Sequence, residues 1–517
     1  MCARMGIIMN KSHDEYNVVT LPVKLDLDEN IKTLDKLLVN CSDVVKRKLS
    51  IGGAQKVDIY ISYLDLMIDR KSLEQNIIDN LLYRMDDLSK QHAYDYIKEH
   101  ALQTADIKEI TTMDEITQAI LSGDVVLLVD GYTKALIISL KSFPSRGVSE
   151  VQSEVTLKGA KDSFTESVAV NKALIRRRIR DTKLKMESLK VGVRSRTDIT
   201  LAYITDIAHE DIISELKERI NAFVIDGIFD IGMLEQLIEH AWYSPFPQYQ
   251  STERPDKAAS ALLEGRIVIL VDNSPMALIL PVTLNSFFQA SDDYYSRWEV
   301  VSFIRILRYL AAIIAIGAPG LYIAITNYQP ELIPTSLALS FAAARRGVPF
   351  TIVIEVIILQ VAFELLSEAG IRLPSPLGNT IGIVGGLIIG EAAVSANLVS
   401  SMVVIVVAFT AIASFTIPNE TFSSAFRLIR YMIIIFTAIL GLFGFIIGMM
   451  LVFIHLSSLE SFGVPYLSPF VAVNHKKEST VGDSILKYPI FKQTKRPFYA
   501  NEDQKIRFRD RQKRNDK

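Results

Sequence analysis

The feature that most constrains the fold of this 517-residue chain is a long stretch from which most charge is missing. No lysine occurs between Lys257 and Lys476, and no aspartate between Asp293 and Asp483. Inside this stretch lie long apolar runs at residues 310–325, 352–363, 381–389, 402–415 and 431–454. Because hydrocarbon excludes charge and a helix needs about 20 apolar residues to cross it, the stretch predicts an all-α polytopic membrane domain.

The composition changes along the chain and predicts its organisation. The formal net charge of −2 averages a soluble first half, an apolar second half and a basic tail. The predicted segments are a partly helical N-terminal extension (1–55), a first soluble α/β module (56–140), a linker with a basic helix (141–195), a second module (196–298), a transmembrane domain with about five spans (299–456) and a basic C-terminal tail (457–517).

The two cysteines, Cys2 and Cys41, provide neither a disulfide framework nor metal-ligand spacing, which fits a reducing compartment. Residues 1–9 are too short for a signal peptide, so we expect the soluble half on the cytoplasmic side.

The soluble half contains an internal repeat at an offset of 140–142 residues. The segment DIYISY at 58–63 resembles DITLAY at 198–203, LSGDVVLLVD at 121–130 resembles LEGRIVILVD at 263–272, and ALI at 135–137 recurs at 277–279. Matched blocks in the same order at a near-constant offset predict a duplicated module.

Each copy has the same predicted elements. β-branched and aromatic residues predict strands at 57–64, 125–129 and 135–140 and, in the second copy, at 198–204, 267–271 and 277–280. Apolar residues at helical spacing predict helices at 72–85, 114–121, 210–223 and 256–263. Each copy is therefore expected to be a small α/β module with a mixed sheet.

The linker contains a basic stretch, residues 171–189, with the sequence RRRIR at 176–180. One interpretation is a contact for lipid headgroups or an acidic partner. The other is a solvated helix whose arginines pair with nearby acids, namely Glu166, Asp181 and Glu187.

The apolar half predicts spans at 299–327, 351–366, 378–396, 400–417 and 429–456. Residues 332–344 are apolar but too short to cross, and predict a re-entrant or interfacial helix. Arg305 and Arg308 near the start of the first span favour a cytoplasmic start. The span count leaves the side of the tail open, but the 13 Lys and Arg against 6 Asp and Glu in residues 476–517 favour the inside.

Four glycines recur every fourth residue in the third span, at Gly378, Gly382, Gly386 and Gly390. Residues at this spacing share one helix face, so they form a shallow groove that admits a close neighbour. The groove indicates either packing within one subunit, or a subunit interface or movable pore helix.

Polar side chains inside the predicted spans are the candidate pore or gating residues: Glu355, Gln360, Glu364, Glu391 and Asn397. A carboxylate in hydrocarbon is costly, so each acid is expected to face protein or water, and an acid lining a water-filled path would favour cations. The alternative is a structural ion pair with Arg345, Arg346 or Arg372.

Motifs of catalysis and of cofactor binding are missing from the sequence. It contains no GxxxxGK[ST], HExxH, GxSxG or Cys/His cluster. The basic clusters lack the aromatic interleaving of a nucleic-acid platform. The sequence therefore predicts no enzyme, no catalytic or metal site, no cofactor and no nucleic-acid partner.

Long motifs around the linker resemble the A subunits of GerA-type spore germinant receptors. They lie at Ser142–Glu150, Val155–Gly159, Asp162–Glu166 and Asn171–Ile179, and again at Pro245–Tyr249, Glu253–Asp256 and Gly265-Arg266. The resemblance extends from about Asp58 to the end of the spans.

The resemblance implies a multi-pass protein of the spore inner membrane. It also implies a complex with a polytopic, transporter-like B subunit and a C-subunit lipoprotein, and a homo-oligomeric ring, with a pentamer as the expected size. The implied activity is a nutrient-gated ion channel that releases monovalent cations. A secondary transporter and a non-conducting scaffold or signalling subunit remain alternatives. A transporter would predict an inverted repeat among the spans, whereas the repeat lies in the soluble half.

Overall fold

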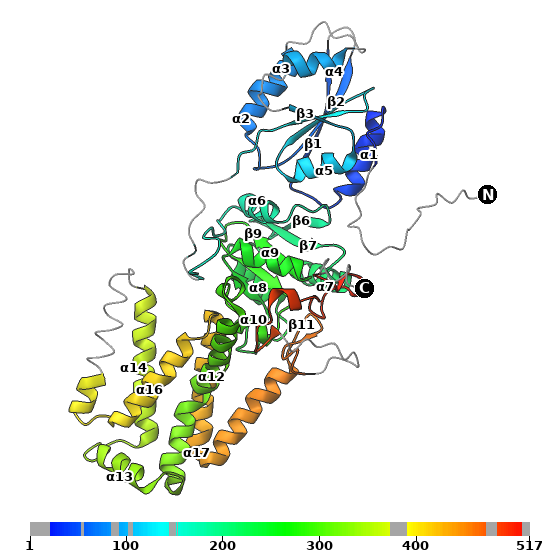
Figure 1. Cartoon of the computed structure of the whole chain (residues 1–517). Helices are drawn as coiled ribbons and strands as arrows, with labels where there is room; N and C mark the ends of the chain where they lie inside the picture. Colours follow the sequence, from blue (N-terminus) through cyan, green and yellow to red (C-terminus); the bar gives the residue numbers. More distant parts are fainter. Residues whose placement is uncertain are drawn as a thin grey trace, which may run out of the picture.

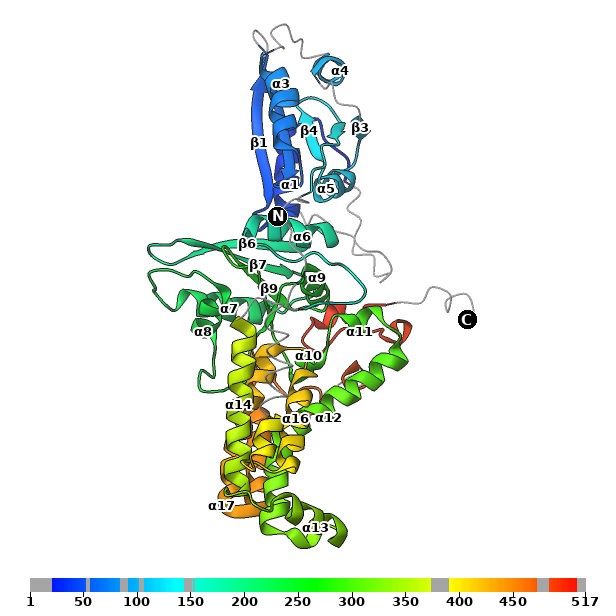
Figure 2. The ribbon, with the colours of Figure 1, turned by 90° about the vertical axis from the view of Figure 1, so that its left-hand side faces the viewer.

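The computed structural model describes residues 21–52, 56–83, 92–101, 107–143, 151, 154–372, 390–471 and 483–508. Two α/β modules follow one another along the molecule, and a bundle of apolar helices extends from the second module (Figure 1). The short helix α13 (Thr335–Ala344) lies at the end of the bundle farthest from the modules in both ribbon views (Figures 1 and 2).

The first module is a five-stranded sheet in the order β1-β2-β4-β5-β3. Its strands are β1 (Val44–Ile51), β2 (Val57–Leu64), β3 (Ile107–Ile110), β4 (Val125–Val129) and β5 (Ala135–Ile138). One face carries the helical segments α2 (Arg70–Leu73), η1 (Glu74–Ile78), α3 (Asp79–Tyr83), α4 (Ala93–Tyr96) and η2 (Ile97–Ala101). The other face carries α1 (Leu27–Leu37) and α5 (Met113–Leu121).

The second module repeats this arrangement, with the strand order β6-β7-β9-β10-β8. Its strands are β6 (Leu184–Val191), β7 (Thr197–Ile204), β8 (Gln250–Thr252), β9 (Ile267–Val271) and β10 (Ala277–Leu280). The helices α7 (Glu210–Asn221) and α8 (Ile231–Ile238) cover one face, and α6 (Val168–Arg178) and α9 (Pro255–Leu263) cover the other. The matched strand orders agree with the repeat in the sequence.

Glycines end the corresponding helices of the two copies. Gly123 follows α5 with φ +85°, and Gly265 follows α9 with φ +95°. Only glycine adopts this conformation without strain, and in each copy one residue separates it from the start of the next buried strand.

The strand directions correct the expectation of mixed sheets, because every pairing between neighbouring strands in both sheets is antiparallel. Continuous buried runs such as β4 and β9 are typical of parallel strands with helices on both faces. Here helices cover both faces of antiparallel sheets, so the continuous burial of these strands did not reveal whether they pair in parallel or antiparallel. The sheets also include β1 and β6, which lie in the predicted extension and linker.

The basic stretch of the linker forms an internal contact between the modules. α6 ends at Arg178, and the following residues form β6 instead of more helix. Arg176 is fully buried and pairs with Asp43 of the first module at 2.8 Å, and Arg178 pairs with Asp162 at 2.6 Å. Pairing with acids thus explains these two arginines, although the partners are not the sequence neighbours that were expected.

The apolar half contains α12 (Trp298–Ile323), continued by η3 (Ala324–Tyr328) and followed by η4 (Pro330–Leu332), then α13, α14 (Ile352–Arg372), helical residues 390–395, α16 (Ser401–Phe415) and α17 (Glu420–Ser458). Two described helices are long and apolar enough to cross a bilayer by length and composition, Trp298–Tyr328 with 31 residues and Glu420–Ser458 with 39.

The last apolar segment is a helical hairpin, which corrects the prediction of one continuous span at 429–456. Gly441 interrupts α17 with φ 61° and ψ −141°, and the second arm runs back along the first (Figure 1). A Cβ placed on Gly448 would lie 3.3 Å from the side chain of Ile433 on the other arm. Glycine is common in membrane helices, so the sequence did not mark this one as a turn.

The C-terminal tail packs on the second module. The hydroxyl of Tyr466 donates to the carbonyl of Pro247 at 2.9 Å, and the amide of Asn501 donates to the carbonyl of Ile207 at 2.8 Å. The strands β11 (Glu460–Ser461) and β12 (Val464–Pro465) form a small hairpin beside it. The tail and the soluble modules therefore lie at the same end of the helical bundle.

Candidate functional site in the apolar helices

A buried arginine connects four helices in the middle of the apolar half. Arg430 on the first arm of α17 is only 4% exposed. Its Nε donates to the backbone carbonyl of Ala315 on α12 at 2.6 Å, its Nη1 to Oε1 of Gln360 on α14 at 2.9 Å, and its Nη2 to Oγ of Ser414 on α16 at 2.6 Å. A charge in an apolar bundle is costly unless it is satisfied by protein groups, and these acceptors hold it there.

Gln360 and Glu364 lie one turn apart on α14 and face α17. Gln360 is 3% exposed and accepts from Arg430. Glu364 lies 3.5 Å from Nη1 of Arg427, and both side chains are about one third exposed. The structure thus brings these two predicted residues together with two arginines that the sequence analysis did not select.

Glu355 is fully buried near the start of α14, at the end of the bundle far from the modules. Its Oε2 accepts the backbone N–H of Ser400 at 2.8 Å, and its Oε1 lies 3.3 Å from Nη2 of Arg345. Because Ser400 precedes α16 and Arg345 follows α13, the carboxylate ties together the ends of three helices. This is the ion pair with Arg345 that the sequence offered as the structural alternative.

Several polar atoms around Glu355 have no hydrogen-bond partner among the described residues. They are the hydroxyls of Tyr322 and Ser400 and Nε of Arg345. An unpaired buried polar atom costs roughly 1–3 kcal/mol. The contact around Arg430 also leaves one buried atom without a partner among the described residues, Nε2 of Gln360, so neither contact is completely satisfied.

The remaining predicted residues lie apart from these contacts. Glu391 is exposed on helical residues 390–395, and Asn397 is exposed in the following turn with φ 52°. Gly390 faces α16, since a Cβ there would lie 3.6 Å from Val404. The predicted glycines Gly378, Gly382 and Gly386 lie outside the described residues.

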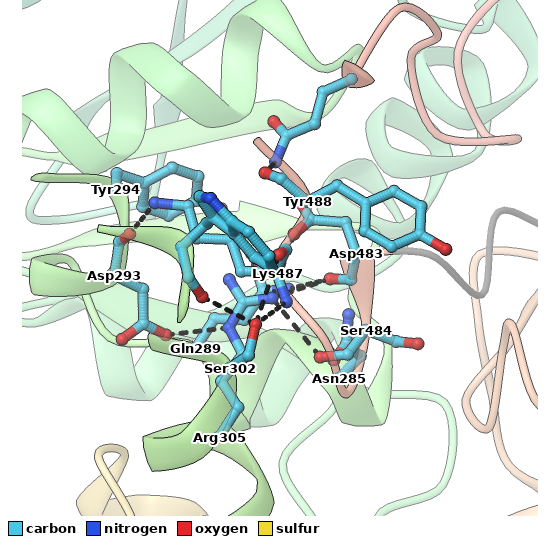
Figure 3. Close-up of polar contacts among 12 residues, drawn as sticks. Asn285, Gln289, Asp293, Tyr294, Ser302, Arg305, Asp483, Ser484, Lys487 and Tyr488 are labelled. Carbon is cyan, nitrogen blue, oxygen red and sulfur yellow. Dashed lines mark hydrogen bonds and ion pairs between the residues drawn. The ribbon is translucent and has the colours of Figure 1, made fainter. Parts of the chain in front are cut away.

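A second polar cluster, which we call the junction cluster, lies where α12 leaves the second module. It consists of Asp293, Arg305, Arg308, Asp483 and Lys487. Figure 3 labels four of them, Asp293, Arg305, Asp483 and Lys487. Arg305 is 1% exposed and lies 3.1 Å from both Asp293 and Asp483, while Arg308 lies 2.8 Å from Asp293. The tail, the second module and the start of α12 are thus joined by ion pairs.

The junction cluster changes the ionisation of its members. Burial raises the pKa of Asp483 to about 6, although the Arg305 guanidinium opposes the shift. Burial, followed by repulsion from Arg305, lowers the pKa of Lys487, whose Nζ donates to the backbone carbonyl of Asp293. The sequence marked Arg305 and Arg308 as topology signals, but it did not show that tail residues return to meet them.

The predicted absence of a metal site is not tested by a structure without ligands. Within the described parts of the chain, no group of three or more His, Cys, Asp or Glu side chains is arranged to hold a metal ion. The contacts of Glu355 with Arg345 and Ser400, and of Gln360 with Arg430, join helices of the bundle to one another.

Comparison with known proteins gives a consistent result. The family model described as Bacillus/Clostridium GerA spore germination protein matches residues 32–499. The uncharacterized membrane protein YfkQ of Bacillus subtilis is 38% identical over 480 residues, covering 92% of this chain and 91% of that protein. Spore germination protein KA of Bacillus subtilis is 39% identical over 481 residues, covering 93% of this chain and 88% of that protein.

Among solved structures, the N-terminal domain of the A subunit of the Bacillus megaterium spore germinant receptor GerK3 is 32% identical, with a TM-score of 0.41, and covers 51% of this chain and 97% of that chain. The family match over residues 32–499 and the relatives aligned over most of their length show that this chain belongs to the GerA spore germination protein family.

Proposed function

We propose that this chain is the A subunit of a spore germinant receptor and that its helical half forms a nutrient-gated channel for monovalent cations in the spore inner membrane. Its partners in this proposal are a polytopic B subunit, a C-subunit lipoprotein, membrane lipid and further copies of itself in a ring of five. The relatives named for spore germination support the receptor assignment.

Insertion of the helical half in a membrane is supported by its outward faces. Large apolar side chains are exposed on α14, α16 and both arms of α17, including Leu365, Phe409, Ile439 and Phe443. Contiguous exposed apolar surface indicates contact with lipid or another protein. We propose a polytopic bundle whose soluble modules and tail stay on the cytoplasmic, spore-core side.

The observation that carries the channel proposal is the contact of Arg430 with three other helices. Opening a pore requires helices to move relative to each other. Such movement is a switch between two discrete packings of the helices, and a polar contact that is made in only one packing favours that packing. Arg430 joins α12, α14 and α16 at one point, so a shift of α14 would break its bond to Gln360.

The candidate pore residues divide into two groups in this proposal. Glu355, Gln360 and Glu364 are bound to protein groups and act as gating contacts. Glu391 and Asn397 are exposed at the far end of the bundle and are the candidates for contact with ions. The glycine row at 378–390 is proposed as a packing groove between subunits or along a movable helix.

The groove is tested by Gly386→Leu, which fills it and is expected to block assembly or opening. Gly370→Leu on α14 is the matched control, because a side chain there meets no atom within 4 Å. Normal oligomer mass and normal germination with Gly386→Leu would remove the groove from the proposal.

Reconstitution of the purified chain in liposomes, alone and with its B and C subunits, separates the candidate functions. Nutrient-dependent K⁺ efflux without coupled uptake supports the channel, and coupled uptake supports a transporter. An intact oligomer that passes no ions under either condition supports the scaffold. The scaffold is favoured by one specific observation, namely that the carboxylates of both Glu355 and Glu364 are already paired with arginines.

A further inference from the structure

A cavity of about 390 Å³ lies between the second module and the C-terminal tail. One wall is formed by α9 and β10, and another by α10 (Leu284–Phe288) and α11 (Asp292–Tyr295). The tail closes it with Lys487, Ile490, Gln493, Arg507 and Phe508. Figure 3 shows three of its wall residues, Gln289, Tyr294 and Lys487, beside the junction cluster.

The walls of the cavity carry more positive than negative charge. The cations in its walls are Lys257, Arg266, Lys487 and Arg507, and the carboxylates are Asp256 and Glu264. Asp256 is already bound by the guanidinium of Arg254, at 2.7 Å, and does not compensate the cations of the wall.

Two carboxylates remain to balance the four cations of the wall. Glu154 pairs with Lys257, and Glu264 lies 3.6 Å from both Arg266 and Arg507. Four positive charges against these two carboxylates leave an excess of two. The acceptors of Lys487 are the backbone carbonyls of Asp293 and Ser296, which carry no net charge.

Apolar groups complete the cavity. Tyr294 and Tyr295 stand on α11, Phe508 closes the cavity from the tail, and Ile279 and Ile490 add aliphatic surface. Ligand sites of this kind combine an apolar slot with a few charged groups that fix orientation, and a volume of roughly 300–1,000 Å³ is typical of them.

We propose that this cavity binds a small soluble organic anion with a ring or short apolar body and one carboxylate or phosphate group. The anionic group lies among Arg266, Lys487 and Arg507, and the apolar body lies against the tyrosines of α11. The inference is about binding and does not depend on whether the chain conducts ions.

Binding in this cavity would affect the start of the helical bundle through the contacts of Lys487. Its Nζ contacts the backbone of Asp293, whose carboxylate holds Arg305 and Arg308 at the start of α12. A bound anion that attracts Lys487 would weaken that contact and alter the docking of the tail on α12.

The test uses the full chain in dodecyl maltoside, a detergent without phosphate, and isothermal titration calorimetry. The probes are benzoate, phenyl phosphate and neutral benzamide. We expect the two anions to bind at concentrations where benzamide does not, and the stronger of the two identifies carboxylate or phosphate as the preferred group. No binding of either anion up to 10 mM (about 3 kcal/mol), or equal binding of benzamide, overturns the proposal.

Two variants make the test specific. Arg507→Gln removes a cation from the rim of the cavity and is expected to weaken anion binding about tenfold, or roughly 1.4 kcal/mol. Lys492→Gln removes an exposed cation from the same tail outside the cavity wall and is expected to leave binding unchanged. Equal loss of affinity in both variants, or unchanged affinity with Arg507→Gln, would contradict the proposed site.

Discussion

Arg430 donates from Nη1 to the side-chain oxygen of Gln360 across 2.9 Å, in a bundle whose surrounding side chains are almost all apolar. The bond links the last helical hairpin to α14. Gln360 was selected from the sequence as a candidate residue, whereas its partner Arg430 was not. We expect the stability of the bundle and its proposed movement to depend on this contact.

Replacing Gln360 by Leu is expected to destabilise the bundle, because it leaves a donor of the buried Arg430 without its acceptor. A hydrogen bond to a charged group contributes roughly 1.5–3 kcal/mol. Thermal unfolding in detergent, followed by tryptophan fluorescence or circular dichroism, measures the effect. The control is Glu364→Gln, whose pair with Arg427 is about one third exposed and contributes roughly 0–1 kcal/mol. Equal midpoints for the two variants would show that the buried bond carries no stability.

Glu355→Gln and Arg345→Gln are expected to give the same phenotype, since each breaks one ion pair between helix ends. We expect a changed threshold for opening in reconstituted liposomes, with ion selectivity preserved. Glu391→Gln, on an exposed side chain, is expected to change selectivity instead. The distinction fails if Glu355→Gln alters the K⁺ to Na⁺ ratio while Arg345→Gln does not.

Gly441→Ala is expected to disrupt the hairpin of α17. The glycine has a conformation, φ 61° and ψ −141°, that costs other residues roughly 1–3 kcal/mol, and a Cβ there would lie 2.8 Å from the ring of Tyr328. Gly317→Ala on α12 is the control, because its Cβ would meet Phe445 at an ordinary 3.4 Å. The yield of monodisperse protein after size-exclusion chromatography measures both. A full yield with Gly441→Ala would show that the turn does not require glycine.

The second module is expected to lose stability as the pH rises from 5 to 8 because of Glu235. Burial, with the nearby Glu239 and Asp230, raises the pKa of Glu235 from 4.5 to about 7. A carboxyl whose pKa is raised on folding adds stability that is complete below its unfolded pKa and is lost as the pH passes the folded pKa.

Glu235→Gln should therefore stabilise the protein at pH 8 by about 1 kcal/mol and have little effect at pH 4, the partial exposure of the side chain reducing the difference. Unfolding midpoints across this range, with the exposed Glu218→Gln as control, measure the dependence. An unchanged pH profile in Glu235→Gln would contradict this origin.

The sequence predicted the duplicated modules well, because the repeated blocks can be read directly from it. The strands and helices within each module follow from short patterns of apolar residues, which are local signals. It identified β2, β4, β7 and β9 and the glycines that end α5 and α9. It did not identify β1 and β6, which each contain two lysines and lie at one end of their sheets, or the direction of the strands. Pairing direction depends on contacts between distant segments.

The candidate site was only partly predictable for the same reason. Polar and acidic side chains in apolar runs are visible in the sequence, so Glu355, Gln360 and Glu364 were selected. Their partners come from other helices, and Arg430 was overlooked because a single arginine in an otherwise apolar helical segment has no distinguishing spacing. Asp483 and Lys487 lie beside Arg305 although nearly 180 residues separate them in the chain, and no local sequence pattern indicates this contact.

The most direct test of the central claim, that the apolar half crosses a membrane and returns the tail to the side of the modules, is cysteine accessibility in sealed vesicles. Cys2 and Cys41 are first replaced by serine, and single cysteines are then placed at the exposed positions Asn397 and Lys492. The account predicts that a membrane-impermeant maleimide labels these two positions from opposite sides of the bilayer. Labelling of both from the same side, in folded and membrane-bound protein, would contradict it.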